Sequence, residues 1–296
     1  MIWIITIIVF LSSLYGIAVL ERWSIYREWD FGYPIKVFSG IFVQEDIKPR
    51  KHDPTFFETA PILFIAAAFL AIGVLPFAAG VVPAGIATGA LFVNAALAYI
   101  MVALLMAGWA PNGVYAMVGG WRFLGQLIAY SMPIVMTITA TVMRAESMDM
   151  LKIVVSQAGL WNIIYQPVGF VLFYLAAMAL AFLPPFDLPQ AGSELAGGVF
   201  AEYTGKRLLL FRLGRLVLIF SLSLAITNFY LGGWQGPLLP GFVWTFIKTM
   251  LVAASLFWAG SFTPRIRHDH TLEWSWKYAT PAALLNILWV GILLLL

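Results

Sequence analysis

Apolar runs long enough to cross a lipid bilayer recur along the whole chain, and they constrain its fold more than any other feature. About 30 Å of hydrocarbon requires roughly 20 apolar residues in a helix. Because these runs lack the alternation of barrel strands, helices satisfy their backbone groups best. We expect an all-α polytopic membrane protein, a single membrane domain over residues 1–296, with eight transmembrane helices at residues 2–20, 57–79, 86–107, 123–143, 160–183, 207–229, 240–261 and 275–296.

Basic residues indicate how these helices are oriented. The even-numbered loops hold only Arg144 and Lys152, whereas the odd-numbered loops hold eleven basic residues: Arg22, Arg27, Lys36, Lys48, Arg50, Lys51, Arg122, Lys206, Arg207, Arg265 and Arg267. By the positive-inside rule the odd loops are cytoplasmic and both termini lie on the opposite side. Topology and anionic lipid explain the net charge of +3, so no nucleic-acid partner is expected.

The chain has no cysteine and three histidines, His52, His268 and His270, all in the expected cytoplasmic loops. It therefore holds no cysteine-ligated iron–sulfur cluster and no haem ligated by two histidines inside the bilayer. We expect no metal site, no bound cofactor and no catalytic residue in this chain. Any redox centres belong to partner proteins.

The first loop, residues 21–56, is the longest segment outside the expected spans. Its middle has apolar residues at helical spacing: Ile35, Val37, Phe38, Ile41 and Phe42. This pattern predicts an interfacial helix in the first cytoplasmic loop. An ordinary connecting loop is the alternative.

A polar loop at residues 183–207 holds three acids, Asp187, Glu194 and Glu202. Charged residues make up only 10% of the chain, so three acids in one short loop are a candidate functional site. Prolines and glycines give this loop a shaped, non-helical backbone. Desolvation near the membrane surface would raise the pKa values of the acids and let them exchange protons. A simple solvated loop is the alternative.

Five segments resemble, in the right order, motifs of the complex I core membrane subunit, called the H subunit in bacteria and subunit 1 in mitochondria. The polar loop contains the family's PFDLP, SEL, AG and EY. The other segments are EDIKP at residues 45–49, GW followed by YAM and GGWR at 108–122, GGWQGPLLPGFVWTFIKT at 232–249, and PRIRHD with WK at 264–277.

The resemblance implies a non-redox subunit of a quinone-reducing, proton-translocating oxidoreductase in a prokaryotic cytoplasmic membrane. Such a subunit anchors a hydrophilic arm, forms the membrane part of the quinone chamber and couples electron transfer to proton translocation. Implied partners are other membrane subunits, iron–sulfur subunits of the arm, quinone as substrate, and lipid. Residues implied in the chamber or in coupling are Glu21, Arg22, Glu45, Asp46, Arg122, Phe186, Asp187, Glu194, Glu202, Tyr203, Arg265 and Arg267.

The chain departs from the family where acids or an arginine are usual, at Leu180, Leu183, Gln190, Gly192, Ser131 and Arg215. We therefore expect it to conduct protons poorly or by another route. The equivalent subunit of a membrane-bound hydrogenase-type complex, and a structural anchor without ion conduction, are the alternatives. A free-standing transporter would carry paired broken helices, which are not evident here.

Three basic residues, Arg212, Arg215 and Lys248, lie well inside the expected spans. Arg212 and Arg215 share one face of a helix and are expected to pair with acids. Lys248 is expected near the bilayer middle, where a cation costs several kcal/mol unless it is paired or hydrated. Because the family carries lysine there, the resemblance implies that Lys248 belongs to a polar axis toward pumping subunits.

Overall fold

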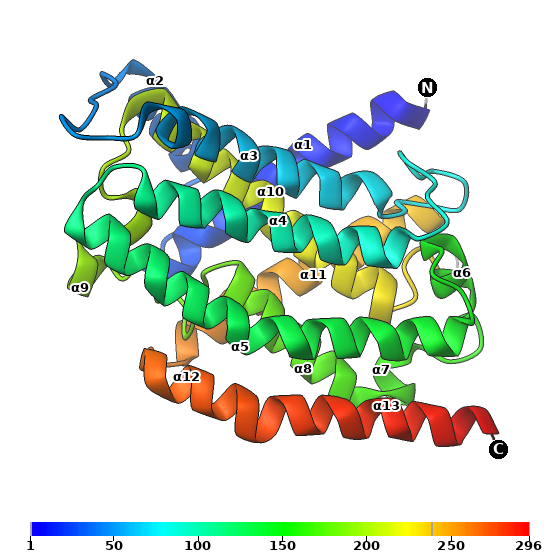
Figure 1. Ribbon diagram of the computed structural model, residues 1–296. Coiled ribbons are helices and arrows are strands. Elements are labelled where there is room, and N and C mark those ends of the chain that lie inside the picture. Colours follow the sequence, from blue (N-terminus) through cyan, green and yellow to red (C-terminus); the bar gives the residue numbers. More distant parts are fainter. Residues whose placement is uncertain (1, 238, 296) are drawn as a thin grey trace.

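Long helices lying side by side make up most of the protein (Figure 1). The computed structural model describes residues 2–237 and 239–295, so Leu238 of the 232–249 motif and Leu296 of the last expected span lie outside the described residues. Seven helices of the described part are long and apolar enough to cross a membrane. They are α1 (Ile2–Tyr26), α3 (Pro54–Val74), α4 (Gly89–Trp109), α5 (Val114–Ala145), α10 (Gly205–Tyr230), α11 (Gly241–Phe262), and the run of α12 (His268–Trp274), the π-helical turn η2 (Ser275–Ala279) and α13 (Thr280–Leu295).

The span expected at residues 160–183 is not one long helix. It consists of the short α7 (Asn162–Tyr165) and of α8 (Pro167–Leu180), which has 14 residues. Pro167 has no backbone N–H and disfavours helical geometry at the residue before it, and Gln166 has φ −139°. At the other end Pro184 and Pro185 stop the chain from continuing as a helix. The apolar run was therefore a poor guide to the length of this helix.

α5 begins at Val114 rather than near residue 123, so Arg122 lies within a helix and not in a loop. Glycines explain how this early turn packs against its neighbours. A β-carbon on Gly108 of α4 would lie 2.9 Å from the Cα atom of Gly120. The two helices thus approach with their backbones in contact.

The helix predicted in the first loop is present as α2 (Tyr33–Val43). Pro34 and Ile41 are buried, whereas Ile35 and Phe42 are 66% and 60% exposed. This amphipathic surface suits the membrane interface, and the position of α2 relative to a bilayer stays a prediction.

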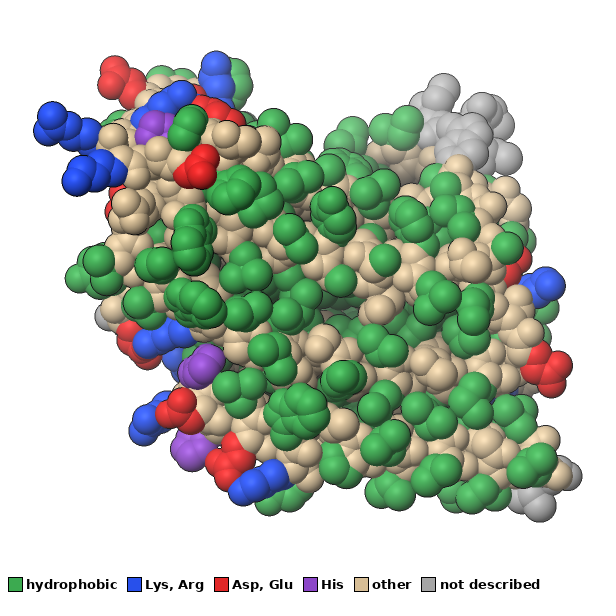
Figure 2. Space-filling model, in the orientation of Figure 1, with side chains coloured by type: hydrophobic (Ala, Val, Ile, Leu, Met, Phe, Trp, Pro, Cys, Tyr) green, Lys and Arg blue, Asp and Glu red, His purple; other side chains and the backbone are tan. Residues whose placement is uncertain are grey.

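α10 forms the centre of the bundle, where it packs against α1, α3 and α11. Every residue from 216 to 230 is buried. α1 begins and α13 ends at the same end of the bundle, and α2, α9 (Gly192–Leu195) and α12 lie at the other end (Figure 1). Charged side chains gather mainly over that second end (Figure 2).

Candidate functional site

The loop that joins α8 to α10 has a compact fold of its own, built from α9 and the short turn η1 (Gly198–Phe200). The carbonyl of Asp187 accepts hydrogen bonds from the backbone N–H groups of Gln190 and Ala191, 3.2 and 3.0 Å away. Gly198 has φ +56°, and a side chain there would collide with the carbonyl of Pro189. Only glycine fits this crossing, so the backbone presents the acids in fixed positions.

Four charged side chains from three parts of the chain form a connected cluster. The Arg265 guanidinium contacts both carboxylate oxygens of Asp187, with Nε 2.6 Å from Oδ1 and Nη2 2.5 Å from Oδ2. Its Nη1 lies 3.5 Å from Oε1 of Glu194, whose Oε2 accepts from Nη1 of Arg122 at 2.6 Å. The cluster, Asp187–Arg265–Glu194–Arg122, joins the loop to α5 and to the connector before α12.

The ion pairs of the cluster shift the pKa values of Glu194 and Arg265 in the directions that keep both groups charged. The hydrogen bond from Arg122 lowers the pKa of Glu194, and the hydrogen bond to Asp187 raises the pKa of Arg265. Both groups are therefore charged at neutral pH. The expectation that desolvation raises the pKa of this acid is wrong for Glu194, because its cationic neighbours outweigh burial.

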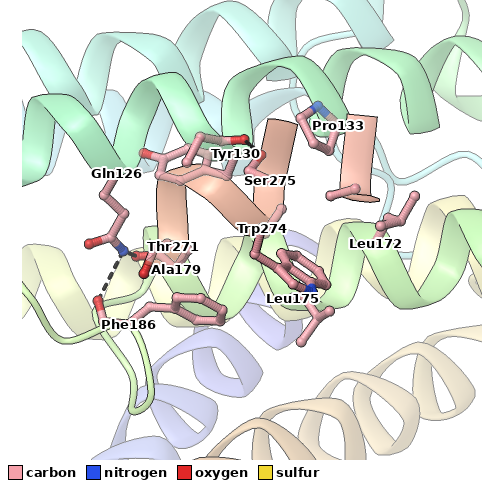
Figure 3. Close-up of a pocket in the computed structure, with 13 residues that line it drawn as sticks. Gln126, Tyr130, Pro133, Leu172, Leu175, Ala179, Phe186, Thr271, Trp274 and Ser275 are labelled. Atoms are coloured by element: carbon pink, nitrogen blue, oxygen red, sulfur yellow. Dashed lines mark hydrogen bonds between the residues drawn. The ribbon is translucent and has the colours of Figure 1, made fainter. Parts of the chain in front are cut away.

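A glutamine that the sequence analysis did not single out also holds the loop. Gln126 of α5 donates from Nε2 to the carbonyls of Ala179 and Phe186, at 2.7 and 2.9 Å (Figure 3). Its Oε1 atom and the hydroxyl of Tyr130 have no partner among the described residues, and both residues line a small pocket of about 30 Å³ beside Ser275. The sequence does carry a sign of this role, because Gln126 is a polar amide within the apolar span expected at residues 123–143.

A second cluster connects the first loop to the start of α10. Arg207 donates to both oxygens of Glu58, at 3.0 and 2.7 Å, and Lys48 donates to the same carboxylate at 2.8 Å. Asp46 accepts from the backbone N–H of Lys206 at 2.9 Å and lies 3.7 Å from Arg207. Glu58, at the start of α3, is the central acceptor here, and the family motifs do not include it.

A cavity of about 600 Å³ lies between α1, α2, α10 and the loop of residues 183–205. Four charged residues line it: Glu21, Asp187, Arg212 and Arg215. Arg215 pairs with Glu21 at 2.9 Å and donates to the carbonyls of Ala181 and Phe182. The expected pairing is thus present for Arg215, whereas Arg212 is exposed in the cavity wall.

The other residues expected in the site lie apart from the Asp187–Arg265–Glu194–Arg122 cluster. Among the described residues, Arg267 forms an ion pair only with Asp269, two positions further on, at 3.1 Å, and both side chains are more than 70% exposed, so it does not hold the loop. Glu202 lies beside Gly113 and has no ion pair among the described residues. Glu45 is exposed. Arg22 covers the ring of Tyr26 at 3.7 Å and lies 3.9 Å from Glu28.

Tyr203 is buried beneath the loop. Its ring stacks on Phe57 with centroids 4.5 Å apart, and its hydroxyl donates to the carbonyl of Ala107 at 3.3 Å. Burial raises the pKa of this hydroxyl. Tyr203 therefore acts as a neutral packing residue that fastens the loop to α3 and α4.

Lys248 contacts the turn between α10 and α11, and its place in a polar axis toward pumping subunits stays a prediction. Its ammonium donates to three backbone carbonyls, those of Leu231, Gly233 and Gln235, at 2.7, 3.2 and 2.7 Å. The ring of Trp161 lies 4.3 Å from the same nitrogen. All three N–H bonds of the ammonium are used by the turn between α10 and α11. The lysine thus fixes this turn at the end of the bundle away from the charged clusters.

Within the part of the chain that the structure describes, no group of three or more His, Cys, Asp or Glu side chains is placed to hold a metal ion. The site consists of ion pairs, a glutamine clamp and a cavity. Such an arrangement can bind an amphiphilic ligand and transmit movement between loop and helices.

These features define a class, namely multi-pass helical membrane proteins with a charged cavity at one end of the bundle. The sequence model of the family described as NADH dehydrogenase matches residues 35–291, and the chain belongs to this family, that of the core membrane subunit of complex I-like complexes. The second of the NADH-quinone oxidoreductase H subunits of Geobacter sulfurreducens is 39% identical over 267 residues, covering 87% of this chain and 81% of the relative. The NADH-quinone oxidoreductase H subunit of Brevibacillus brevis is 37% identical over 253 residues, covering 84% and 75%.

A solved structure has the same fold. A chain of the membrane-bound sulfane sulfur reductase, an archaeal respiratory membrane complex, superposes with a TM-score of 0.85 over 97% of both chains. At 21% identity this likeness concerns the fold alone.

Proposed function

We propose that this chain anchors the hydrophilic arm of a quinone-reducing complex and forms the membrane wall of its quinone chamber. The observation that carries the proposal is the cavity of about 600 Å³ whose wall includes Asp187. A cavity with both apolar and charged walls suits a molecule with a long apolar tail and a polar head. The chain supplies the binding surface, and iron–sulfur subunits of the arm supply the electrons.

We further propose that the charged cluster couples events in the cavity to the helices. Asp187 lines the cavity and is bound to Arg265, which also contacts Glu194. Glu194 in turn is bound to Arg122 on α5. A change of charge beside Asp187 alters the balance of these pairs and reaches α5 and α12 through direct contacts. The complex as a whole uses this movement to drive proton translocation.

Protons cross the membrane mainly through other subunits in this proposal. Leu180 and Ser131 cannot gain or lose a proton near neutral pH, and Arg215 is engaged by Glu21. Glu202 is the one acid of the loop that has no ion pair among the described residues. Glu202→Gln is therefore expected to leave the number of protons moved per electron pair unchanged in reconstituted vesicles.

The proposal includes location and orientation. The chain is a single domain in a prokaryotic cytoplasmic membrane, with both termini on the non-cytoplasmic side. The gathering of Lys and Arg at one end of the bundle supports this orientation.

Purification of the tagged chain from its native membrane in mild detergent tests the function. Iron–sulfur subunits should copurify, and the preparation should reduce an added quinone. Recovery of an isolated chain would reject the anchoring role. Copurification with a nickel–iron hydrogenase subunit, without quinone reduction, would establish the hydrogenase-type alternative instead.

A further inference from the structure

Two arginines line the cavity, and only one of them, Arg215, forms an ion pair with the described residues. Of its two acids, Glu21 is bound to Arg215 at 2.9 Å and Asp187 is bound to Arg265 at 2.5 Å. Arg215 also donates hydrogen bonds from Nε and Nη2 to the carbonyls of Ala181 and Phe182. Both carboxylates are thus neutralised without any contribution from Arg212.

Arg212 lies three residues before Arg215 on α10, and the two share a helix face. It is exposed, it lines the cavity, and no ion pair or hydrogen bond joins it to the described residues. A guanidinium offers five N–H donors in a planar fork and stays protonated. The cavity therefore presents an available cationic donor.

The cavity that Arg212 lines has apolar walls as well as polar and charged ones. Val37, Phe38, Phe200 and Phe211 line the same cavity. A charge next to such walls is less screened than one in water, so its attraction for an oxygen acceptor is stronger. The cavity thus suits an apolar ligand whose head presents acceptor oxygens, and it favours a negatively charged head.

We propose that Arg212 holds the head of the bound quinone by donating to a carbonyl oxygen, and that it gives this chamber a preference for quinones with an anionic head. This inference rests on the quinone chamber proposed above. Arg212 is a binding and specificity residue here, and no electron or proton passes through it.

The test compares two ligands on the purified complex: 1,4-naphthoquinone, which is neutral, and 2-hydroxy-1,4-naphthoquinone, which is an anion at neutral pH. Dissociation constants are measured by calorimetry, and KM and kcat by quinone reduction. Arg212→Gln removes the charge, and Arg212→Lys keeps it without the planar fork. Lys206→Gln is the matched control, because Lys206 is an exposed cation of the same helix outside the cavity lining.

Loss of a charge-assisted hydrogen bond should weaken the anionic ligand about a hundredfold and the neutral one about tenfold in Arg212→Gln. KM should rise with little change in kcat. Arg212→Lys should keep most of the affinity for the anion, and Lys206→Gln should match the unaltered complex.

Unchanged affinities in Arg212→Gln would overturn the inference and leave the chamber intact. Loss of arm subunits from the Arg212→Gln preparation would also overturn it, because Arg212 would then pair with an acid of a partner. If the unaltered complex neither binds nor reduces either quinone, the chamber itself is rejected. That result appears before any substitution, so the two failures are distinguishable.

Discussion

At the scale of single residues, two arginines separated by one position have opposite environments. Arg265 is held by Asp187 and Glu194, whereas the one ion pair of Arg267 within the described part of the chain is with the exposed Asp269. Motif resemblance placed both in the coupling site, because a loop sequence does not reveal which side chain turns inward. Ion-pair partners depend on tertiary packing, so the residue types were predictable and their pairing was not.

Asp187→Asn should lower turnover of the assembled complex about three- to tenfold, because Arg265 loses its charged acceptor. Steady-state quinone reduction by purified complexes of equal subunit content measures the effect. Arg267→Ala is the control and should retain normal turnover. Equal losses in both variants would contradict the assigned roles.

The lowered pKa of Glu194 has a consequence for pH. Its ion pairs contribute at neutral pH and are lost only as the pH falls through a pKa below the ordinary value of 4.5. Hydrogen exchange of residues 183–205, corrected for intrinsic rates, should therefore stay constant from about pH 7 to 5 and rise only when the pH is below the ordinary pKa of 4.5. Glu194→Gln should exchange faster at neutral pH and respond less to acid. A transition near pH 6 in the unaltered protein would count against this explanation.

At the scale of elements, apolar length predicted most helices well because lipid leaves the backbone no other partner. It failed at α8, where Pro167 and Gln166 break the run, and at the start of α5, which includes the polar-looking segment around Arg122. The three carbonyls that bind Lys248 could not be predicted either, because every residue has a backbone carbonyl and the sequence does not indicate which ones a side chain reaches. Local signals specified the helices, and tertiary contacts specified what joins them.

Lys248→Met should destabilise the turn between α10 and α11, because three carbonyls lose their shared donor. We expect the thermal unfolding midpoint of the chain in the purified complex to fall by about 5 °C. Lys152→Met, which removes an exposed lysine on α6 (Met150–Val155), should leave the midpoint unchanged. Equal midpoints in both variants would show that these three hydrogen bonds add no stability.

At the scale of the whole molecule, the bundle has one charged end and one end where the chain begins and finishes (Figures 1 and 2). We predict that α8, although short, completes a pass, because α1 begins and α13 ends at the same end of the bundle. Lys51 and Gly159 are exposed at opposite ends of the bundle, in the first loop and in the turn after α6.

Single cysteines can test this orientation, because the chain contains none of its own. A membrane-impermeant maleimide should label Gly159→Cys in intact cells whose outer membrane, where present, has been opened. Lys51→Cys should react only after the inner membrane is broken. Gly159 tolerates the change, since a β-carbon there meets nothing within 4 Å. The reverse labelling pattern would invert the proposed topology.

The Asp187–Arg265–Glu194–Arg122 cluster also bears on how the protein responds to salt. Dissolved ions screen charges beyond about 3 Å at 1 M ionic strength. The Asp187–Arg265 contact is 2.5 Å long and its side chains are only 26% and 24% exposed, whereas Lys51 and its neighbours lie open to water. A concentrated salt wash should thus remove proteins that are held on the exposed charges before it opens the loop. The washed membranes should keep the loop folded. In the proposed function, the hydrophilic arm could then bind to it again once the salt is diluted.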